Sequence, residues 1–184
     1  MTHLNTIIAC IVISLPSSVF AQFSGELKKM INDSDPEYSE YEQLIYDASK
    51  YVFDNSFDVD SKEWISATKV VEFWMNKDTE LVYIPTFGNF YEAITNNKQQ
   101  FLYVIAMINY RLDQKLNHNR LVPFVPIEGQ KYSDQEDVRE VQIEGAKIIL
   151  QYSGDKNNNF TLPSQSKKYS KAWKKKELEK VFFK

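Results

Sequence analysis

The sequence predicts an all-α fold, either a single-domain helical bundle or a set of stacked helical hairpins, with about six to seven helices. Two observations carry this prediction. Apolar residues recur at spacings of three and four along most of the chain, and the alternation typical of strands is sparse. No internal repeat with a period near 34 residues is present. A short solenoid of helical repeats is the alternative architecture.

Two helices are expected first, and they should pair as a hairpin. The first covers residues 36–54, where one stripe collects five apolar residues: Tyr38, Tyr41, Ile45, Ala48 and Val52. The second covers residues 61–76. Asp60 and Glu63 have the spacing of a capping box at its start.

The middle of the chain is expected to contain the central helix. Residues 78–86 should be extended because Pro85 ends a short apolar run, and a short helix should follow at 87–95. A long helix begins after Asn97 and is apolar on nearly every side between residues 101 and 108, as a buried helix would be. Three polar residues should then face solvent: Arg111, Asp113 and Lys115.

Three segments complete the predicted order. Residues 121–130 contain two prolines and should be extended over the bundle. A helix should resume after Ser133, whose spacing to Glu136 fits a capping box, and Gly154 suits its end. A basic helix at about 166–182 should close the chain.

The first 21 residues are predicted to be a cleavable signal peptide. The apolar run at 7–15 is too short to span a bilayer, and Val19 and Ala21 are the small residues expected before a cut at Gln22. The working domain would then comprise residues 22–184 and lie in the periplasm, with secretion as the alternative. Cleavage would also remove Cys10, the only cysteine of the chain.

Lysines are concentrated at the C-terminal end. Residues 167–184 contain 8 lysines and 2 glutamates, net +6, whereas residues 22–166 carry 14 basic and 23 acidic residues, net −9. Lys174, Lys175 and Lys176 are therefore candidate binding residues for an anionic partner. The alternative is that this segment docks onto the protein's own acidic body with its lysines solvated.

A second candidate surface is aromatic. It comprises residues that flank Pro85 and Gly88 in a segment expected to be irregular: Tyr83, Phe87, Phe90 and Tyr91. Rigid aromatic side chains in such a place can be presented to a protein partner or a sugar. At least half of them are expected to belong to the core.

Several kinds of chemistry are disfavoured by composition. The mature chain would have one histidine, His118, and no cysteine, so no metal, cofactor or catalytic triad is predicted. The run from Asp155 to Asn159 begins like a calcium loop, but Phe160 stands where the turn glycine belongs. Carboxylate chemistry is the remaining enzymatic route. Its candidates lie beside aromatic residues and are expected on solvated helix surface: Glu63, Glu72 and Glu92.

The segment 67–110, which contains Val-Val-Glu-Phe-Trp-Met at 70–75 and the aromatic linker, is similar to small exported helical proteins of the Bacteroidota. This resemblance covers about a quarter of the chain and implies no catalytic residue. The predicted function is an exported binding protein that contacts another envelope protein and no nucleic acid; membrane-surface contact through the basic helix is not favoured. The alternative function is a carboxylate-dependent hydrolase of envelope polysaccharide, which requires at least two acidic groups converging in a cleft.

Overall fold

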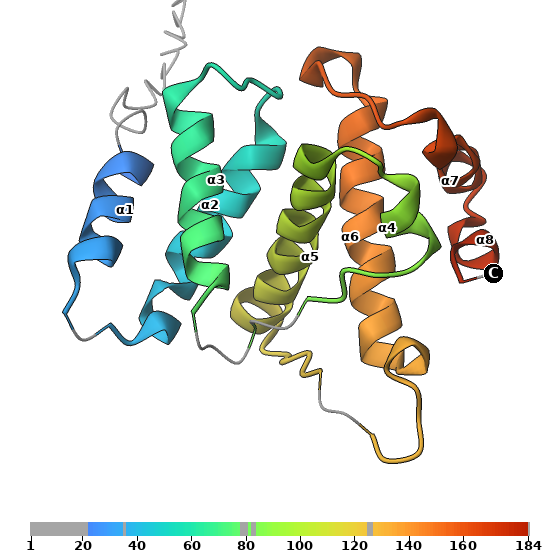
Figure 1. The fold of residues 1–184 in the computed structure, drawn as a ribbon, viewed down its shortest axis with the longest axis horizontal. Coiled ribbons are helices and arrows are strands. Elements are labelled where there is room, and N and C mark those ends of the chain that lie inside the picture. Colours follow the sequence, from blue (N-terminus) through green and yellow to red (C-terminus); the bar gives the residue numbers. More distant parts are fainter. Residues whose placement is uncertain (1–21, 35, 78–80, 82–83, 125–126, 184) are drawn as a thin grey trace, which may run out of the picture.

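The computed structural model describes residues 22–34, 36–77, 81, 84–124 and 127–183, and this part of the chain is all-α, as predicted. Tyr83 and the predicted signal peptide at 1–21 lie outside the described residues. Eight α-helices are described: α1 Gln22–Asn32, α2 Glu42–Asp54, α3 Lys62–Met75, α4 Asn89–Ala93, α5 Asn97–His118, α6 Glu136–Gly154, α7 Lys167–Lys174 and α8 Leu178–Phe182. Across the molecule lie α1, the pair α2 and α3, α5, α6 and finally α7 with α8, and α2 packs on both α3 and α5 (Figure 1). Helix α4 departs from this order, because it precedes α5 in the chain but lies on the side of α5 that faces α7 and α8 (Figure 1).

Helices α2 and α3 form the expected hairpin, but the capping prediction for α3 is wrong. Ser61 caps this helix, because its hydroxyl accepts a hydrogen bond from the Trp64 backbone N–H at 3.2 Å. The Glu63 carboxylate is buried and accepts a hydrogen bond from the Phe23 backbone N–H at 3.0 Å. Glu63 therefore joins α3 to the first turn of α1, a helix that the sequence analysis did not predict.

Helix α5 is the predicted central helix, and it packs closely against α6. All seven side chains from Leu102 to Ile108 are buried. Gly145 permits the close approach of α6, because a Cβ atom there would lie 2.5 Å from Met107 Cγ and 3.1 Å from the Met107 backbone nitrogen. Helix α6 ends at Gly154 as predicted, but it begins without the expected capping box, since Ser133 lies in a separate 3₁₀ turn, Tyr132–Asp134.

The C-terminal segment is not the single helix that was predicted. Helix α7 ends in a Schellman motif, in which the Lys176 N–H donates to the Trp173 carbonyl at 2.9 Å and the Glu177 N–H donates to the Ala172 carbonyl at 2.8 Å. Lys176 takes the left-handed conformation that this motif requires, with φ +58°. Helix α8 then starts in a new direction (Figure 1). Apolar residues that do not share one face of a continuous helix can therefore all reach the core.

Arg111 is buried in the core and not solvated, contrary to the sequence-based prediction. Its side chain is 1% exposed. The guanidinium donates hydrogen bonds to the Val122 carbonyl at 2.8 Å and the Leu81 carbonyl at 2.9 Å, and it lies 4.1 Å from the ring centroid of Phe124. Burial lowers the pKa of Arg111 to about 10. The side chain holds together the segments that precede α4 and follow α5.

Candidate binding surface

Helix α7 and the turn after it present a continuous set of exposed lysines, called the lysine face below: Lys167, Lys168, Lys171, Lys174, Lys175 and Lys176. Within the described residues, no carboxylate forms an ion pair with any of the six, and the Lys168 ammonium lies 4.7 Å from the ring centroid of Tyr169. The lysine face is therefore available to an anionic partner.

The opposite side of the C-terminal segment is apolar and fixes it to the bundle. Its buried residues are Tyr169, Ala172, Leu178 and Phe182. The ring of Phe90 from α4 lies 4.9 Å from that of Tyr169 and 5.3 Å from that of Phe182, measured between centroids. The segment thus docks on its own domain, and its lysines are solvated, as one alternative expected. Aromatic packing makes the contact, without ion pairs to the acidic body among the described residues.

The same contacts account for the aromatic residues predicted to bind. Phe90 is 1% exposed and belongs to the core, so it cannot form part of an exposed patch. Phe87 and Tyr91 are half-buried, with their rings beside those of Tyr132 and Tyr103. Tyr83 lies outside the described residues. The large apolar side chains that are exposed in the described part lie elsewhere: Ile31, Val59, Leu121 and Ile127.

Of the three glutamates considered for catalysis, two are exposed and one is buried. Glu72 and Glu92 are exposed, as expected. Glu63 is buried, against expectation, but its carboxylate is engaged by the backbone of α1. Another buried carboxylate, that of Glu42, accepts a hydrogen bond from the Lys115 ammonium at 2.8 Å. Each of the two buried carboxylates therefore has its own partner.

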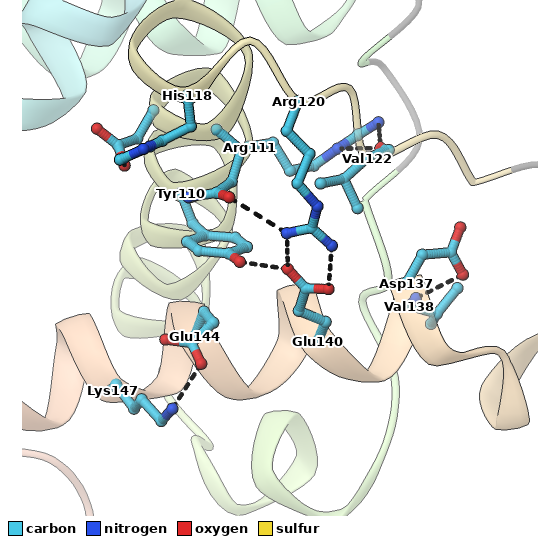
Figure 2. Close-up of polar contacts among 12 residues, drawn as sticks. Tyr110, Arg111, His118, Arg120, Val122, Asp137, Val138, Glu140, Glu144 and Lys147 are labelled. Atoms are coloured by element: carbon cyan, nitrogen blue, oxygen red, sulfur yellow. Dashed lines mark hydrogen bonds and ion pairs between the residues drawn. The ribbon is translucent and has the colours of Figure 1, made fainter.

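Glutamates do gather on one side of α6, around a hollow of about 300 Å³ that is lined by residues including Glu136, Glu140, Glu144 and Glu179. Figure 2 shows how its central carboxylate is held. The guanidinium of Arg120 donates two parallel hydrogen bonds to Glu140, at 2.5 and 2.6 Å, and the Tyr110 hydroxyl donates a third. Glu144 pairs with Lys147 (Figure 2).

Arg120, more than any other group, lowers the pKa of Glu140, and the Tyr110 hydroxyl adds to this effect. Burial raises the pKa of Tyr110, and the hydrogen bond to Glu140 raises it further. A general acid in a glycosidase needs a carboxyl group with a raised pKa. The central group of this hollow is shifted in the opposite direction, so the hollow gives the hydrolase alternative no support.

Comparisons with protein-family models, with curated proteins and with solved structures find no match. The similarity to exported Bacteroidota proteins therefore stays a prediction from the sequence. In the described part of the chain, none of the helices combines the length and the apolar character needed to cross a membrane.

The residues considered as metal ligands have structural roles. The described residues contain no group of three or more metal-ligating side chains. The Asp155 carboxylate accepts a hydrogen bond from the Asn157 backbone N–H at 2.9 Å and closes the turn after α6. His118 is exposed at the end of α5, and its Nε2 lies 3.3 Å from an oxygen of Asp113. The lysine face is thus a surface whose charges form no ion pairs within the described residues.

Proposed function

We propose that the protein is an exported interaction module that binds an acidic partner protein of the envelope through its lysine face. One observation carries this proposal: six neighbouring lysines are exposed on a segment that its apolar residues, above all Tyr169 and Phe182, hold against the bundle. Like charges repel when they are crowded, so such a cluster is unfavourable for the isolated molecule. The negative charges of an acidic partner would offset the repulsion between the lysines, and the lysines would attract that partner before it makes contact.

The backbone at Lys176 supports the same proposal. Three residues other than glycine have positive φ in the described chain, and two of them are Asn119 and Asn159. Asparagine tolerates the left-handed region, whereas a longer side chain there costs about 1 kcal/mol or more. Glycine is the usual residue at this position of a Schellman motif. A lysine in this position therefore suggests that its charge is useful.

A protein partner is favoured over a lipid surface because of what lies beneath the lysines. A basic helix that binds membranes by insertion needs an apolar face directed at the acyl chains. In α7 and α8, Trp173 and Val181 are half-buried and the other apolar residues are buried, whereas the exposed side chains are charged. The face turned outward therefore offers charge without an apolar stripe. Nucleic acid is not favoured, because the signal peptide predicted at residues 1–21 would take the chain out of the cytoplasm.

A charge-neutralising variant tests the proposal. The protein and its Lys174→Gln/Lys175→Gln/Lys176→Gln variant would be titrated against poly-L-glutamate as an acidic probe, with binding followed by calorimetry. We expect the variant to bind at least about ten-fold more weakly, since three clustered charges are lost. Raising the salt concentration from 50 to 200 mM should weaken binding of the unmodified protein and reduce the difference in affinity between it and the variant.

A matched control removes three exposed lysines from other surfaces: Lys62, Lys69 and Lys131. Their replacement by glutamine changes the net charge by the same amount, yet it should weaken binding no more than about two-fold. Equal losses in both variants would show that only net charge matters and would contradict a specific face. Binding to vesicles with anionic lipids, but not to poly-L-glutamate, would identify a lipid surface instead.

A further inference from the structure

A groove separate from the lysine face lies between the first halves of α3 and α5, two helices whose placement Figure 1 shows. Its volume is about 220 Å³. Apolar side chains form most of the lining: Phe57, Val59, Trp64, Ile65, Phe101 and Leu102. The loop that carries Phe57 is held by a hydrogen bond from the Phe57 N–H to the Asn158 carbonyl, at 2.8 Å. The groove is therefore lined by two helices and a hydrogen-bonded loop.

Two polar residues line the groove, and one of them is charged. Thr68 uses its hydroxyl to donate to the Ile65 carbonyl at 2.8 Å. Lys98, the second residue of α5, is exposed, and its ammonium has no ion-pair partner among the residues that the structure describes. Asp58, which precedes Val59, turns its carboxylate toward the backbone N–H groups of Asp60 and Ser61. The groove thus combines an apolar channel with one cation.

We propose that this groove binds a straight-chain carboxylic acid, with the alkyl chain along the apolar lining and the carboxylate beside Lys98. The volume is below the range of about 300–1,000 Å³ usual for drug-sized ligands, so a slender chain fits better than a ring system. One ammonium group matches one acidic head group. Val59 lines the groove and is 44% accessible, so the groove is open to solvent at this residue and the alkyl chain can enter there.

A peptide fits the groove less well. A bound peptide brings backbone N–H and C=O groups, which need hydrogen-bond partners when they leave water. The lining provides only the Lys98 ammonium and a threonine hydroxyl whose proton is already donated. An alkyl chain has no hydrogen-bond donors or acceptors, so it needs no polar partners in the groove. The shortage of polar partners therefore favours an alkyl carboxylate.

A series of ligands tests the proposal with the full protein. Hexanoate, octanoate and decanoate would be titrated calorimetrically below their micelle-forming concentrations. Affinity should rise about four-fold for each added methylene until the groove is filled, because each buried methylene contributes a similar increment. Decanol should bind about three- to five-fold more weakly than decanoate, and decyltrimethylammonium more weakly still, because they lack the anionic head.

Two variants locate the site. Lys98→Gln should weaken decanoate binding about three- to five-fold and leave decanol binding unchanged, whereas Lys62→Gln, on the exposed surface of α3, should change neither. Val59→Asp should weaken decanoate binding at least about ten-fold. Its control is Ile31→Asp, which places the same charge at another exposed apolar residue, 54% accessible, outside the groove. Both aspartate variants should fold, since neither side chain is buried.

Several results would overturn the proposal. One is the absence of binding for the whole acid series. Another is decanoate binding that survives both Lys98→Gln and Val59→Asp but is lost in the Lys174→Gln/Lys175→Gln/Lys176→Gln variant, which would place the acid on the lysine face. A third is binding of N-acetyl-phenylalanine amide without binding of the acids, which would assign the groove to an apolar side chain of a partner protein.

Discussion

Lys176 combines an unfavourable backbone conformation with an exposed charge, so stability and binding can be separated at this residue. Replacement by glycine removes the cost of a Cβ atom in the left-handed region, which is about 1–2 kcal/mol, although the unfolded chain gains some flexibility. We expect Lys176→Gly to raise the free energy of unfolding by about 0.5–1 kcal/mol, measured by urea denaturation. The same variant should bind poly-L-glutamate more weakly than the unmodified protein.

The neighbouring lysine supplies the control for that change. Lys175 has φ −89°, a value that any residue adopts without strain, and its side chain is also exposed. Lys175→Gly should therefore lower the free energy of unfolding, because only the flexibility of the unfolded chain changes. Loss of stability in both variants would show that Lys176 is not strained. That result would also remove one of the two arguments for a functional role of its charge.

Among the helices, those with a long apolar stripe could be predicted from the sequence, and the exceptions have physical reasons. Helices α2, α3, α5 and α6 have apolar residues that recur at helical spacing, so periodicity reveals them. Helix α1 carries a signal of the same kind over a shorter stretch, in Phe23, Leu27 and Met30, which could have revealed it. The break after α7 contains neither glycine nor proline and therefore gave no local signal.

At the candidate site too, features set by a residue's own chemistry could be predicted, whereas features set by contacts with residues far along the chain could not. Exposure of the lysines follows from their charge, so the sequence could indicate it. Burial of Phe90 depends on Tyr169 and Phe182, which lie far along the chain. Glu63 likewise lies 40 positions from Phe23, and it accepts a hydrogen bond from the Phe23 backbone N–H. Periodicity describes one element at a time, and it cannot report contacts between elements.

The link between α1 and α3 allows a prediction about an element. Glu63→Ala would leave the Phe23 N–H without its acceptor and remove a negative charge from the N-terminal end of α1, at a cost of about 1–3 kcal/mol. Glu63→Gln keeps an acceptor oxygen and should cost less. Hydrogen exchange would show faster exchange in α1 than in α5 for the alanine variant. Equal exchange rates in α1 of both variants and the unmodified protein would contradict the link.

At the scale of the whole molecule, two carboxylates connect the second half of α5 to its neighbours. Asp113 on α5 accepts a hydrogen bond from the Tyr46 hydroxyl of α2 at 2.9 Å, and Glu140 on α6 accepts one from Tyr110 of α5. Burial alone would raise the pKa of Asp113, but hydrogen bonds from Asn117, Tyr46 and His118 outweigh it and lower the pKa. The pKa of Glu140 is also lowered. Both groups therefore stabilise the fold in their ionised form.

These lowered pKa values predict how stability depends on pH. A carboxyl group with a lowered pKa in the folded state contributes fully above its unfolded pKa, which is near 4, and the contribution disappears as the pH falls through the folded value. We expect the two groups together to lower the free energy of unfolding by about 1–2 kcal/mol between pH 5 and pH 2, allowing for solvent screening.

Chemical denaturation across that pH range measures this loss of stability. The Asp113→Asn/Glu140→Gln variant should lose less stability on acidification than the unmodified protein, by the amount that the two groups contribute. The control Glu37→Gln/Glu72→Gln removes two carboxylates whose side chains are exposed, and it should keep the full loss. Equal losses of stability in the two double variants would contradict the prediction. They would show that the contacts of α5 through Asp113 and Glu140 do not stabilise the molecule at neutral pH.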